Sequence, residues 1–261
     1  MQMLSNGKHK QNRIRRIMAL KEKMIIVGAG FMANEIVDFI EHYDLYDIVG
    51  FTVNEEYFRG DTYLGRPVYP MEKLEEYYKP DEVKLFIAIS YYQEMMGVRE
   101  VKFNELKARG YHFANVISPR SYIWTDELGE GNWIFDNVYI GYKAKLGSNS
   151  ILRAGCEVEH YSVVGDNCFI AGNTMVTGHV TIGDRSFIGI SCAIHNRVNI
   201  GKKCVVGGGC VIKYDVPDYS LCIANNATIV QRDEKSIEKY ADASRLKKMT
   251  NQTTAITNNC D

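Results

Sequence analysis

Aliphatic residues recur at every sixth position through the second half of the chain. The series runs without interruption through Ile134, Ile140, Leu146, Leu152, Val158, Val164, Ile170, Val176, Ile182, Ile188, Ile194, Ile200, Val206 and Ile212. Small or β-branched residues stand two positions before them, and glycine often follows, where we expect a turn that needs a permissive backbone. This period predicts a parallel β-helix, in which short strands lie on three flat faces and coils of three hexads stack about 4.8 Å apart.

The same frame accounts for most of the cysteines. Cys156, Cys168, Cys192, Cys204, Cys210 and Cys222 all fall in the small, inward-facing position, and only Cys260 lies in the tail. Convergent spacings such as Cys-x-x-Cys are absent from the sequence. Free cysteine is among the most buried residue types. We therefore predict cysteines that fill the core of the coil, with no metal site and no disulfide, as in a reducing compartment.

The region 23–118 alternates between apolar strands and helices. Strands are expected at 24–27, 47–53, 84–90 and 112–117, and helices within 28–43 and at 94–109. In the segment GAGFMANEIVDFIEHY, the apolar face of the first helix is made by Ile36, Val37, Phe39 and Ile40. Strands that alternate with helices predict a small parallel sheet of Rossmann-like type. Pro119 marks the expected junction with the β-helix.

The flanks complete the expected order of domains. We expect a basic, disordered extension at 1–22, a Rossmann-like domain at 23–118, a β-helix domain at 119–230, and a C-terminal helix with a disordered tail at 231–261. The stretch 213–219 breaks the repeat, and Pro217 closes the last coils. An amphipathic helix fits 233–248.

Charge and hydropathy narrow the classes of function. The 261 residues carry a formal net charge of −1 with both signs interspersed, which gives no general attraction to nucleic acid or anionic membrane. No apolar run reaches the roughly 18 to 20 residues of a membrane span, and the first residues lack the apolar core of a signal peptide. We expect a cytoplasmic protein whose partners are small molecules.

Segments in both regions resemble one known family. They are GAGFMANEI near the start, LFIAIS before the long helix, VEHYSVVGDNCFIAGNTMVTGHVTIG and FIGISCAI in the repeat, and VVGGGCVIKYDVP at its end. Over residues 23–230 the chain resembles the bacterial hexapeptide-repeat sugar acyltransferases, which include sialic-acid O-acetyltransferases and nucleotide-amino-sugar N-acetyltransferases. The resemblance implies a left-handed β-helix and a homotrimer. It also implies acetyl-CoA in the groove between neighbouring β-helices, and a nucleotide-linked sugar in the N-terminal domain.

A catalytic residue follows from the same resemblance. The family motif of apolar, Glu, His, x, x, apolar, apolar, Gly is matched by residues 158–165, which places His160 at the catalytic histidine. An attacking amine or hydroxyl must lose a proton to reach the thioester carbonyl, and an imidazole with a pKa of about 6.5 can take that proton at neutral pH. His179 and His195 are rival candidates, because His179 lies about one coil above His160.

The resemblance also implies the binding residues. The acetyl donor is assigned to Gly178, Ile190, Gly208 and Phe169, and the nucleotide sugar to Gly28, Ala29, Gly30 and Ser90. A glycine turn before a helix can offer backbone N–H groups to phosphate. The sequence departs from the family at Phe31 and Met32, where glycine and histidine are common, at Val53 and Tyr161, where acids are common, and at Phe169, where a second histidine is common.

Three functions compete at this point. The leading hypothesis is an acetyl-CoA-dependent N- or O-acetyltransferase that makes a modified sugar for a surface glycan. The pattern GxGxxA at 28–33 favours an NAD-dependent enzyme, but the acid expected about twenty positions later is missing, and Asn54 and Glu55 are approximate substitutes. Tyr161 and Phe169 fit a β-helix scaffold whose site has decayed. Binding of acetyl-CoA separates the first hypothesis from the other two.

Overall fold

The computed structural model of this protein describes residues 21–90, 96–225 and 231. The chain divides into two compact units, Met1–Ala224 and Asn225–Asp261. Every helix and strand described below belongs to the first unit. Of the predicted elements, the extension over 1–20 and the helix at 233–248 lie outside the described residues.

The N-terminal sheet is almost entirely parallel. Its strands are β1 (Lys23–Val27), β2 (Asp47–Val53), β3 (Thr62–Tyr63), β4 (Arg66–Pro70), β5 (Lys84–Ile87) and β6 (His112–Phe113), in the order β3-β4-β2-β1-β5-β6. Among the strands of the described residues, only β3 and β4 pair antiparallel. The sequence predicted β1 and β2 closely but missed the hairpin of β3 and β4, because this short polar stretch has no apolar period.

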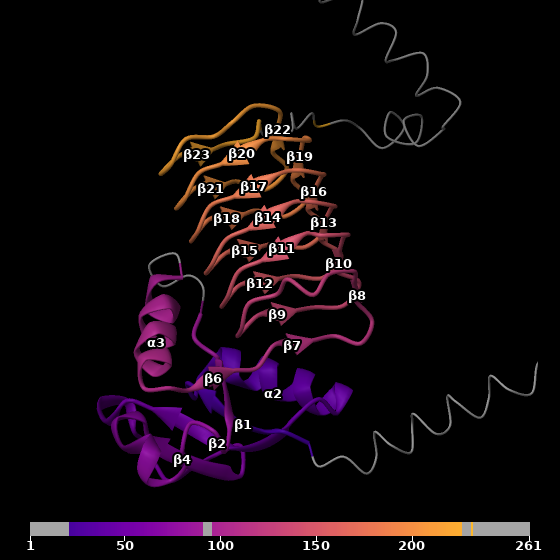
Figure 1. Cartoon of the computed structure of the whole chain (residues 1–261). Helices are drawn as coiled ribbons and strands as arrows, with labels where there is room; N and C mark the ends of the chain where they lie inside the picture. Colours follow the sequence, from indigo (N-terminus) through magenta and orange to yellow (C-terminus); the bar gives the residue numbers. More distant parts are fainter. Residues whose placement is uncertain (1–20, 91–95, 226–230, 232–261) are drawn as a thin grey trace, which may run out of the picture. The chain divides into compact units, whose positions relative to one another are not determined.

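Helices cover both faces of this sheet. They are α2 (Phe31–Tyr43) and α3 (Gly97–Ala108), with the 3-10 helices η1 (Glu55–Tyr57) and η2 (Met71–Glu76). Met24 and Ile26 of β1 point to the side of α2, and their core continues into Trp133 of the following domain. Ile25 and Val27 of β1 point to the opposite side of the sheet, where apolar residues of η2 and α3 pack against them. Figure 1 shows α2 between the sheet and the stacked coils.

The second domain is a left-handed parallel β-helix with three faces, as predicted. The first face holds β7 (Val116–Ile117), β9 (Trp133–Ile134), β12 (Ile151–Leu152), β15 (Phe169–Ile170), β18 (Phe187–Ile188), β21 (Val205–Val206) and β23 (Leu221–Cys222). The second holds β8 (Tyr122–Ile123), β10 (Tyr139–Ile140), β13 (Glu157–Val158), β16 (Met175–Val176), β19 (Ala193–Ile194) and β22 (Val211–Ile212). The third holds β11 (Lys145–Leu146), β14 (Val163–Val164), β17 (Thr181–Ile182) and β20 (Asn199–Ile200).

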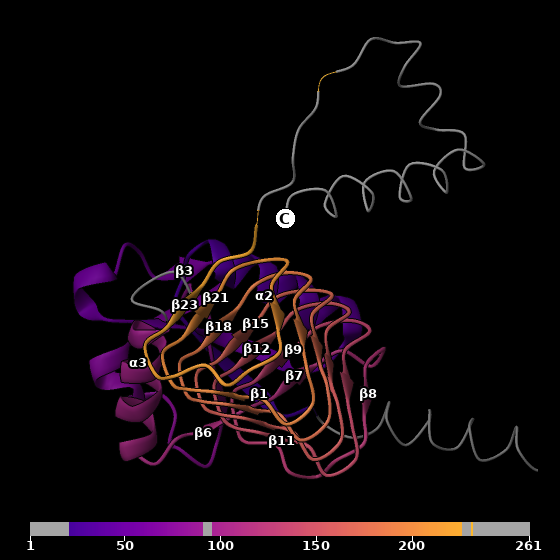
Figure 2. The same cartoon turned by 90° about the horizontal axis from the view of Figure 1, so that it is seen from above.

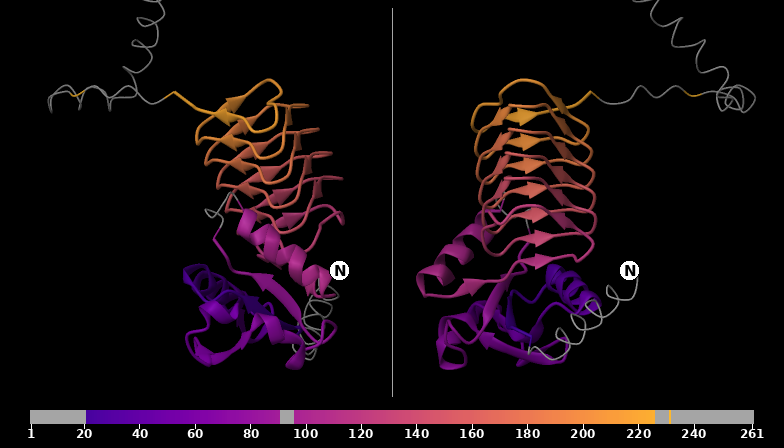
Figure 3. Two further views of the ribbon diagram at one scale, coloured as in Figure 1. Left: turned by 90° about the vertical axis from the view of Figure 1, so that its left-hand side faces the viewer. Right: turned by 45° about the vertical axis from the view of Figure 1, so that its right-hand side comes forward.

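The hexad of aliphatic residues fills the inside of this coil. Each member of the series is the second residue of a two-residue strand, and each is buried. The three-cornered outline of the coil is visible from above in Figure 2, and the ladders of parallel strands in Figure 3. The prediction of the period is therefore confirmed strand by strand.

Glycines of the repeat serve a purpose different from the predicted one. The left-handed turn conformation falls two positions beyond them, as at Asn149 and Asn167, and asparagine tolerates it well. Gly183 shows what the glycines do, since a Cβ there would lie 2.6 Å from the backbone nitrogen of Lys202 in the next coil. These glycines permit close stacking of coils.

The strand predicted at 112–117 is two strands in different sheets. β6 pairs with β5 in the N-terminal sheet, whereas β7 pairs with β9 in the β-helix. Asn115 stands between them and fixes the crossing, because its side chain donates to the Gly129 carbonyl at 2.7 Å and accepts from the Asn132 N–H at 2.9 Å. The strand predicted at 84–90 ends at Ile87.

The predicted break at 213–219 does not end the β-helix. Val216 forms a parallel bridge with Ile200, and Cys222 pairs with Val206, so the last coil is two residues shorter than the one below it. Cys222 consequently occupies an aliphatic position, and its predicted place in the small inward position is wrong. It is partly exposed, whereas the five earlier cysteines of the β-helix are buried.

Candidate functional site

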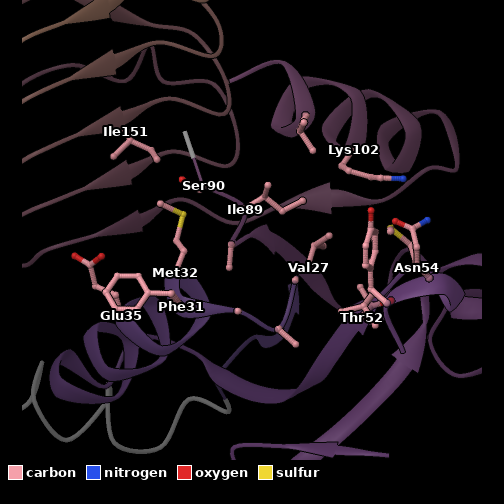
Figure 4. A pocket seen from close by; sticks show the side chains of 18 of the residues that line it. Val27, Phe31, Met32, Glu35, Thr52, Asn54, Ile89, Ser90, Lys102 and Ile151 are labelled. Atoms are coloured by element: carbon pink, nitrogen blue, oxygen red, sulfur yellow. The ribbon is translucent and has the colours of Figure 1, made fainter. Parts of the chain in front are cut away.

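A pocket of about 830 Å³ lies at the carboxyl ends of β1, β2 and β5, against the first face of the β-helix. Its lining comprises Val27, Gly28, Ala29, Gly30, Phe31, Met32, Glu35, Thr52, Val53, Asn54, Tyr57, Met71, Ala88, Ile89, Ser90, Val98, Lys102, Ile151, Arg153 and Phe169. Figure 4 shows side chains of the N-terminal domain facing Ile151 of β12 across it. Ligands of open parallel sheets bind at this edge.

The glycine turn forms the floor of the pocket. Gly28 has φ of 108°, and a Cβ there would lie 3.0 Å from the Ala88 carbonyl oxygen, so both backbone conformation and space require glycine. A Cβ on Gly30 would meet nothing within 4 Å. Helix α2 begins directly afterwards, with no side-chain cap and no acid in its first turn. Its first N–H groups are therefore able to bind an anion.

The β-helix supplies the opposite wall. Phe169 is buried and stacks on Phe187 with ring centroids 5.2 Å apart and an angle of 6°. Arg153 lies over the ring of Phe135 at 3.8 Å and donates to Glu35 of α2 at 2.8 Å. The structure thus brings Phe169, assigned from the sequence to the acetyl donor, into the same pocket as the four residues assigned to the nucleotide sugar.

His160 lies elsewhere, where the chain turns from the second face to the third. Its side chain is 51% exposed, and its Nδ1 is 3.4 Å from Oε2 of Glu159. A carboxylate beside Nδ1 favours the tautomer that carries its proton there, which leaves Nε2 as the basic nitrogen. Sequence reasoning missed Glu159 as a partner, although it occupies the acidic position of the matched motif.

Gly178 provides the space for the imidazole of His160. A Cβ on Gly178 would lie 2.6 Å from both Cε1 and Nε2 of that ring. Gly178 is itself buried, and its carbonyl oxygen accepts from the Arg197 N–H at 3.2 Å. The missing side chain at Gly178 therefore leaves room for the His160 ring. Its assignment to the acetyl donor stays a prediction.

Aromatic rings surround His160. The ring of Tyr161 stacks on His179 with centroids 5.1 Å apart, and the His179 ring is 5.5 Å from that of His160. Tyr142 meets Tyr161 edge to face at 5.8 Å. His179 thus shares the corner of His160 one coil above it, and His195 is an exposed residue at the same turn one coil above His179.

Ile190 and Gly208 occupy a different corner, where the chain turns from the first face to the second. Ile190 is 57% exposed, and a Cβ on Gly208 would lie 3.1 Å from Cγ2 of Ile190. The whole second face separates this corner from His160. A single chain therefore does not bring Ile190 and Gly208 together with the predicted base, whereas Gly178 lies against it.

The described residues contain neither a cluster of metal ligands nor a membrane-spanning helix. Within 21–90, 96–225 and 231, no group of three or more His, Cys, Asp or Glu side chains is arranged to hold a metal ion. No helix in the described part of the chain is both long enough and apolar enough to cross a membrane.

Three sequence families match parts of the chain. Residues 23–94 match the PglD N-terminal domain, residues 161–189 the bacterial transferase hexapeptide, and residues 179–214 the hexapeptide repeat of succinyl-transferase. The matches confirm the expected resemblance in both domains, and with it the expected class of enzyme, an acyltransferase. No protein of curated function matches the chain in sequence.

Solved structures share the whole two-domain fold. A mutant perosamine N-acetyltransferase from Caulobacter crescentus, in complex with CoA and GDP-perosamine, is 24% identical with a TM-score of 0.67, over 82% of this chain and 99% of that one. WeeI from Acinetobacter baumannii AYE is 24% identical with a TM-score of 0.66, over 80% and 100%. The acetyltransferase domain of PglB from Neisseria gonorrhoeae FA1090, in complex with acetyl coenzyme A, is 19% identical with a TM-score of 0.65, over 77% and 95%.

Proposed function

We propose that this chain, with its PglD-like N-terminal domain and transferase hexapeptide repeat, transfers an acetyl group from acetyl-CoA to a nucleotide-linked sugar destined for a surface glycan. The pocket at the glycine turn would hold the nucleotide sugar. His160 would be the general base. Proteins of the same fold were solved with CoA and GDP-perosamine, and with acetyl coenzyme A, which supports both classes of ligand.

The proposed chemistry needs one base and no covalent enzyme intermediate. The amine or hydroxyl of the sugar forms a bond to the thioester carbonyl carbon, and the bond from that carbon to sulfur then breaks. His160 takes the proton from the attacking group through Nε2 and gives it to the departing CoA thiolate. Glu159, beside Nδ1, holds the ring in place during transfer.

The separation of the two corners supports a site shared between chains. On a single chain, acetyl-CoA that contacts Ile190 and Gly208 lies at a different corner from His160, with the second face between them. In a closed ring of three chains, the corner with His160 on one chain can face the corner with Ile190 and Gly208 on its neighbour. We therefore propose a homotrimer in which His160 acts on a donor bound along the neighbouring β-helix. A sedimentation mass equal to that of one chain would contradict it.

The observation that carries the proposal is the setting of His160. It is an exposed histidine immediately before the matched transferase hexapeptide at 161–189, with a carboxylate at Nδ1 and, at Gly178, a residue without a side chain beside its ring. Packing alone does not require this arrangement.

Acetyl transfer tests the proposal directly. The purified chain is incubated with acetyl-CoA and a panel of nucleotide-linked amino and hydroxy sugars, and release of the CoA thiol is followed. We expect His160→Ala to lower turnover by about 10² to 10⁴ while the affinity for acetyl-CoA in a calorimeter stays nearly unchanged. His179→Ala, at the same corner, is the matched control and should retain turnover.

Other results would assign the site differently. Full turnover in His160→Ala with none in His179→Ala would transfer the role of base to His179. A wild-type chain that releases no heat with acetyl-CoA would contradict the proposal and favour an NAD-dependent enzyme or a decayed scaffold.

A further inference from the structure

One end of the pocket has a mostly apolar and aromatic lining. It lies at the carboxyl end of β2 and is lined by Thr52, Val53, Asn54, Tyr57 and Met71. The Thr52 hydroxyl is already used, because it donates to the Tyr69 carbonyl at 3.0 Å. Val53, Tyr57 and Met71 are apolar or aromatic, and Lys102 of α3, which also lines the pocket, donates to Oε2 of Glu105 at 2.8 Å. Such a lining, with few polar groups that fix orientation, is typical of a binding site for a flat heterocycle.

The orientation of the Asn54 amide follows from its partner. Its Nδ2 donates to Oε1 of Glu72 at 2.7 Å, while Oε2 of Glu72 accepts from the Glu55 N–H at 3.0 Å. An ionised carboxylate can only accept hydrogen bonds, so the amide must turn its NH₂ group toward Glu72. The carbonyl oxygen Oδ1 then faces away from Glu72. Figure 4 shows that oxygen on the pocket side of Asn54.

We propose that Oδ1 of Asn54 reads the nucleobase of the nucleotide-linked sugar, and that Glu72 is a positioning residue that holds this acceptor toward the base. The inference rests on the proposed function, since it concerns the nucleotide of that substrate. The central ring nitrogen on the pairing edge is an N–H donor in uracil and guanine and an acceptor in cytosine and adenine. A fixed carbonyl oxygen opposite this nitrogen selects uridine or guanosine nucleotides.

Four nucleoside diphosphates test the selection in the full chain. Binding of UDP, CDP, GDP and ADP is measured by calorimetry. We expect UDP to bind more tightly than CDP, and GDP more tightly than ADP, each by about tenfold, because the disfavoured base places one acceptor against another. All four ligands carry the same ribose and diphosphate, so contacts of Asn54 with ribose would not separate them.

Substitution of Glu72 makes the sharper test. In Glu72→Gln, the new carbonyl oxygen still accepts from the Glu55 N–H, so the new NH₂ group faces Asn54. Asn54 must then turn its own carbonyl toward that NH₂ and present its NH₂ to the base. We expect the preference to invert, with CDP bound more tightly than UDP. Glu76→Gln, on the same 3-10 helix, is the matched control and leaves the preference unchanged.

A double variant restores the original polarity. In Asn54→Asp with Glu72→Gln, one carboxylate oxygen accepts from the new amide and the other faces the base as an acceptor. We expect UDP to bind more tightly than CDP again. Each comparison is the ratio of the affinities of one protein for two nucleotides. Partial unfolding lowers both affinities by the same factor and leaves the ratio unchanged.

The outcomes separate this inference from the function on which it rests. Equal affinity of the wild-type chain for UDP and CDP would overturn the inference, and so would a Glu72→Gln chain that keeps the wild-type preference. A chain that binds none of the four nucleotides would overturn the proposed function itself. An inverted preference that the double variant restores would support the inference, because a merely structural role of Glu72 does not predict it.

Discussion

At the scale of single residues, the position of the His160 ring depends on Gly178, which has no side chain. Gly178 does not have a positive φ, so its backbone tolerates alanine. A methyl group there would nevertheless lie 2.6 Å from Nε2 of His160 and push the imidazole aside. Small displacements of a catalytic group are costly, so we expect Gly178→Ala to lower turnover about 10²-fold while the melting temperature changes little. Unchanged turnover would show that the ring is not held in this position for catalysis.

The core cysteines give a prediction that depends on pH. Burial raises the pKa of both Cys156 and Cys168 to about 12, far from the value near 9 of an exposed thiol. The thiolate is the reactive form, so we expect both to resist alkylation at pH 8 until the chain unfolds. Cys222, partly exposed, should react first among the β-helix cysteines. Peptide mass analysis after a short exposure to iodoacetamide checks this order.

The same shift has a consequence for stability. Between about pH 9 and about pH 12 the folded chain keeps thiol protons that the unfolded chain releases. The unfolded state binds fewer protons there, so the free energy of unfolding falls as the pH rises through this window. The contribution of these thiols is complete below pH 9.

Residues were predicted from the sequence where one local pattern dictates them. The motif around His160 is contiguous, so its exposed histidine could be found, together with the neighbouring Glu159 that was overlooked. Gly178 was assigned to the donor from the family resemblance, and its contact with the His160 ring one coil below was not predicted, because the two residues are distant in sequence. Arg153 gave no signal, since its contact with Glu35 joins residues far apart in the chain.

At the scale of elements, a buried arginine joins α3, β5 and the β-helix. Arg99 is fully buried, and its Nη1 donates to the carbonyls of Ile87 and Ile89 at 2.6 and 3.1 Å. Its Nη2 donates to Oδ1 of Asn149 at 2.8 Å. Burial lowers the pKa of Arg99 to about 9, so the group is a cation at neutral pH, and its hydrogen-bond acceptors among the described residues are neutral oxygens. Each of these acceptors is therefore important.

Removal of one acceptor should be measurable. Asn149→Ala leaves Nη2 of Arg99 without its partner in a buried site, and we expect a loss of about 1–3 kcal/mol in the free energy of unfolding. Asn137→Ala is the matched control, because both asparagines have positive φ, of 57° and 56°, but Asn137 is exposed. Urea titrations of both variants check the difference. Equal losses would mean that the effect comes from the backbone conformation alone.

Elements were predictable where their period was long. The six-residue period predicted every strand of the β-helix up to Ile212, because one repeat unit stacks on the next and each strand needs an aliphatic residue at the same position. The split of the strand at 112–117 could not be seen in the sequence, because hydrophobicity does not change there. Side-chain hydrogen bonds of Asn115 decide where the chain leaves the first sheet. The break of the repeat at 213–219 was visible in the sequence, but the shortened coil that it produces was not predicted, and Cys222 was therefore assigned to the wrong position.

At the scale of the whole molecule, the two predicted halves of the active site lie on different corners of one β-helix. His160 is at the turn from the second face to the third, and Ile190 and Gly208 are at the turn from the first to the second. Both corners are exposed in the single chain. A trimer can close such a site three times, with each chain contributing a different corner to each of its two neighbours.

Mixed trimers test this arrangement. One variant, His160→Ala, lacks the base, and the other, Ile190→Trp, fills the donor groove of its own chain; each alone should show little transfer. When the two are co-expressed in equal amounts, random assembly pairs an intact His160 with an intact groove at about a quarter of the interfaces, and we expect activity to return to about that fraction of the wild type. The physical reason is that each damaged corner meets an undamaged one from a neighbour. Purified variants mixed without exchange of chains are the control and should stay inactive. If co-expression restores nothing while both variants remain trimeric, the base and the donor groove belong to one chain, and the shared site is wrong.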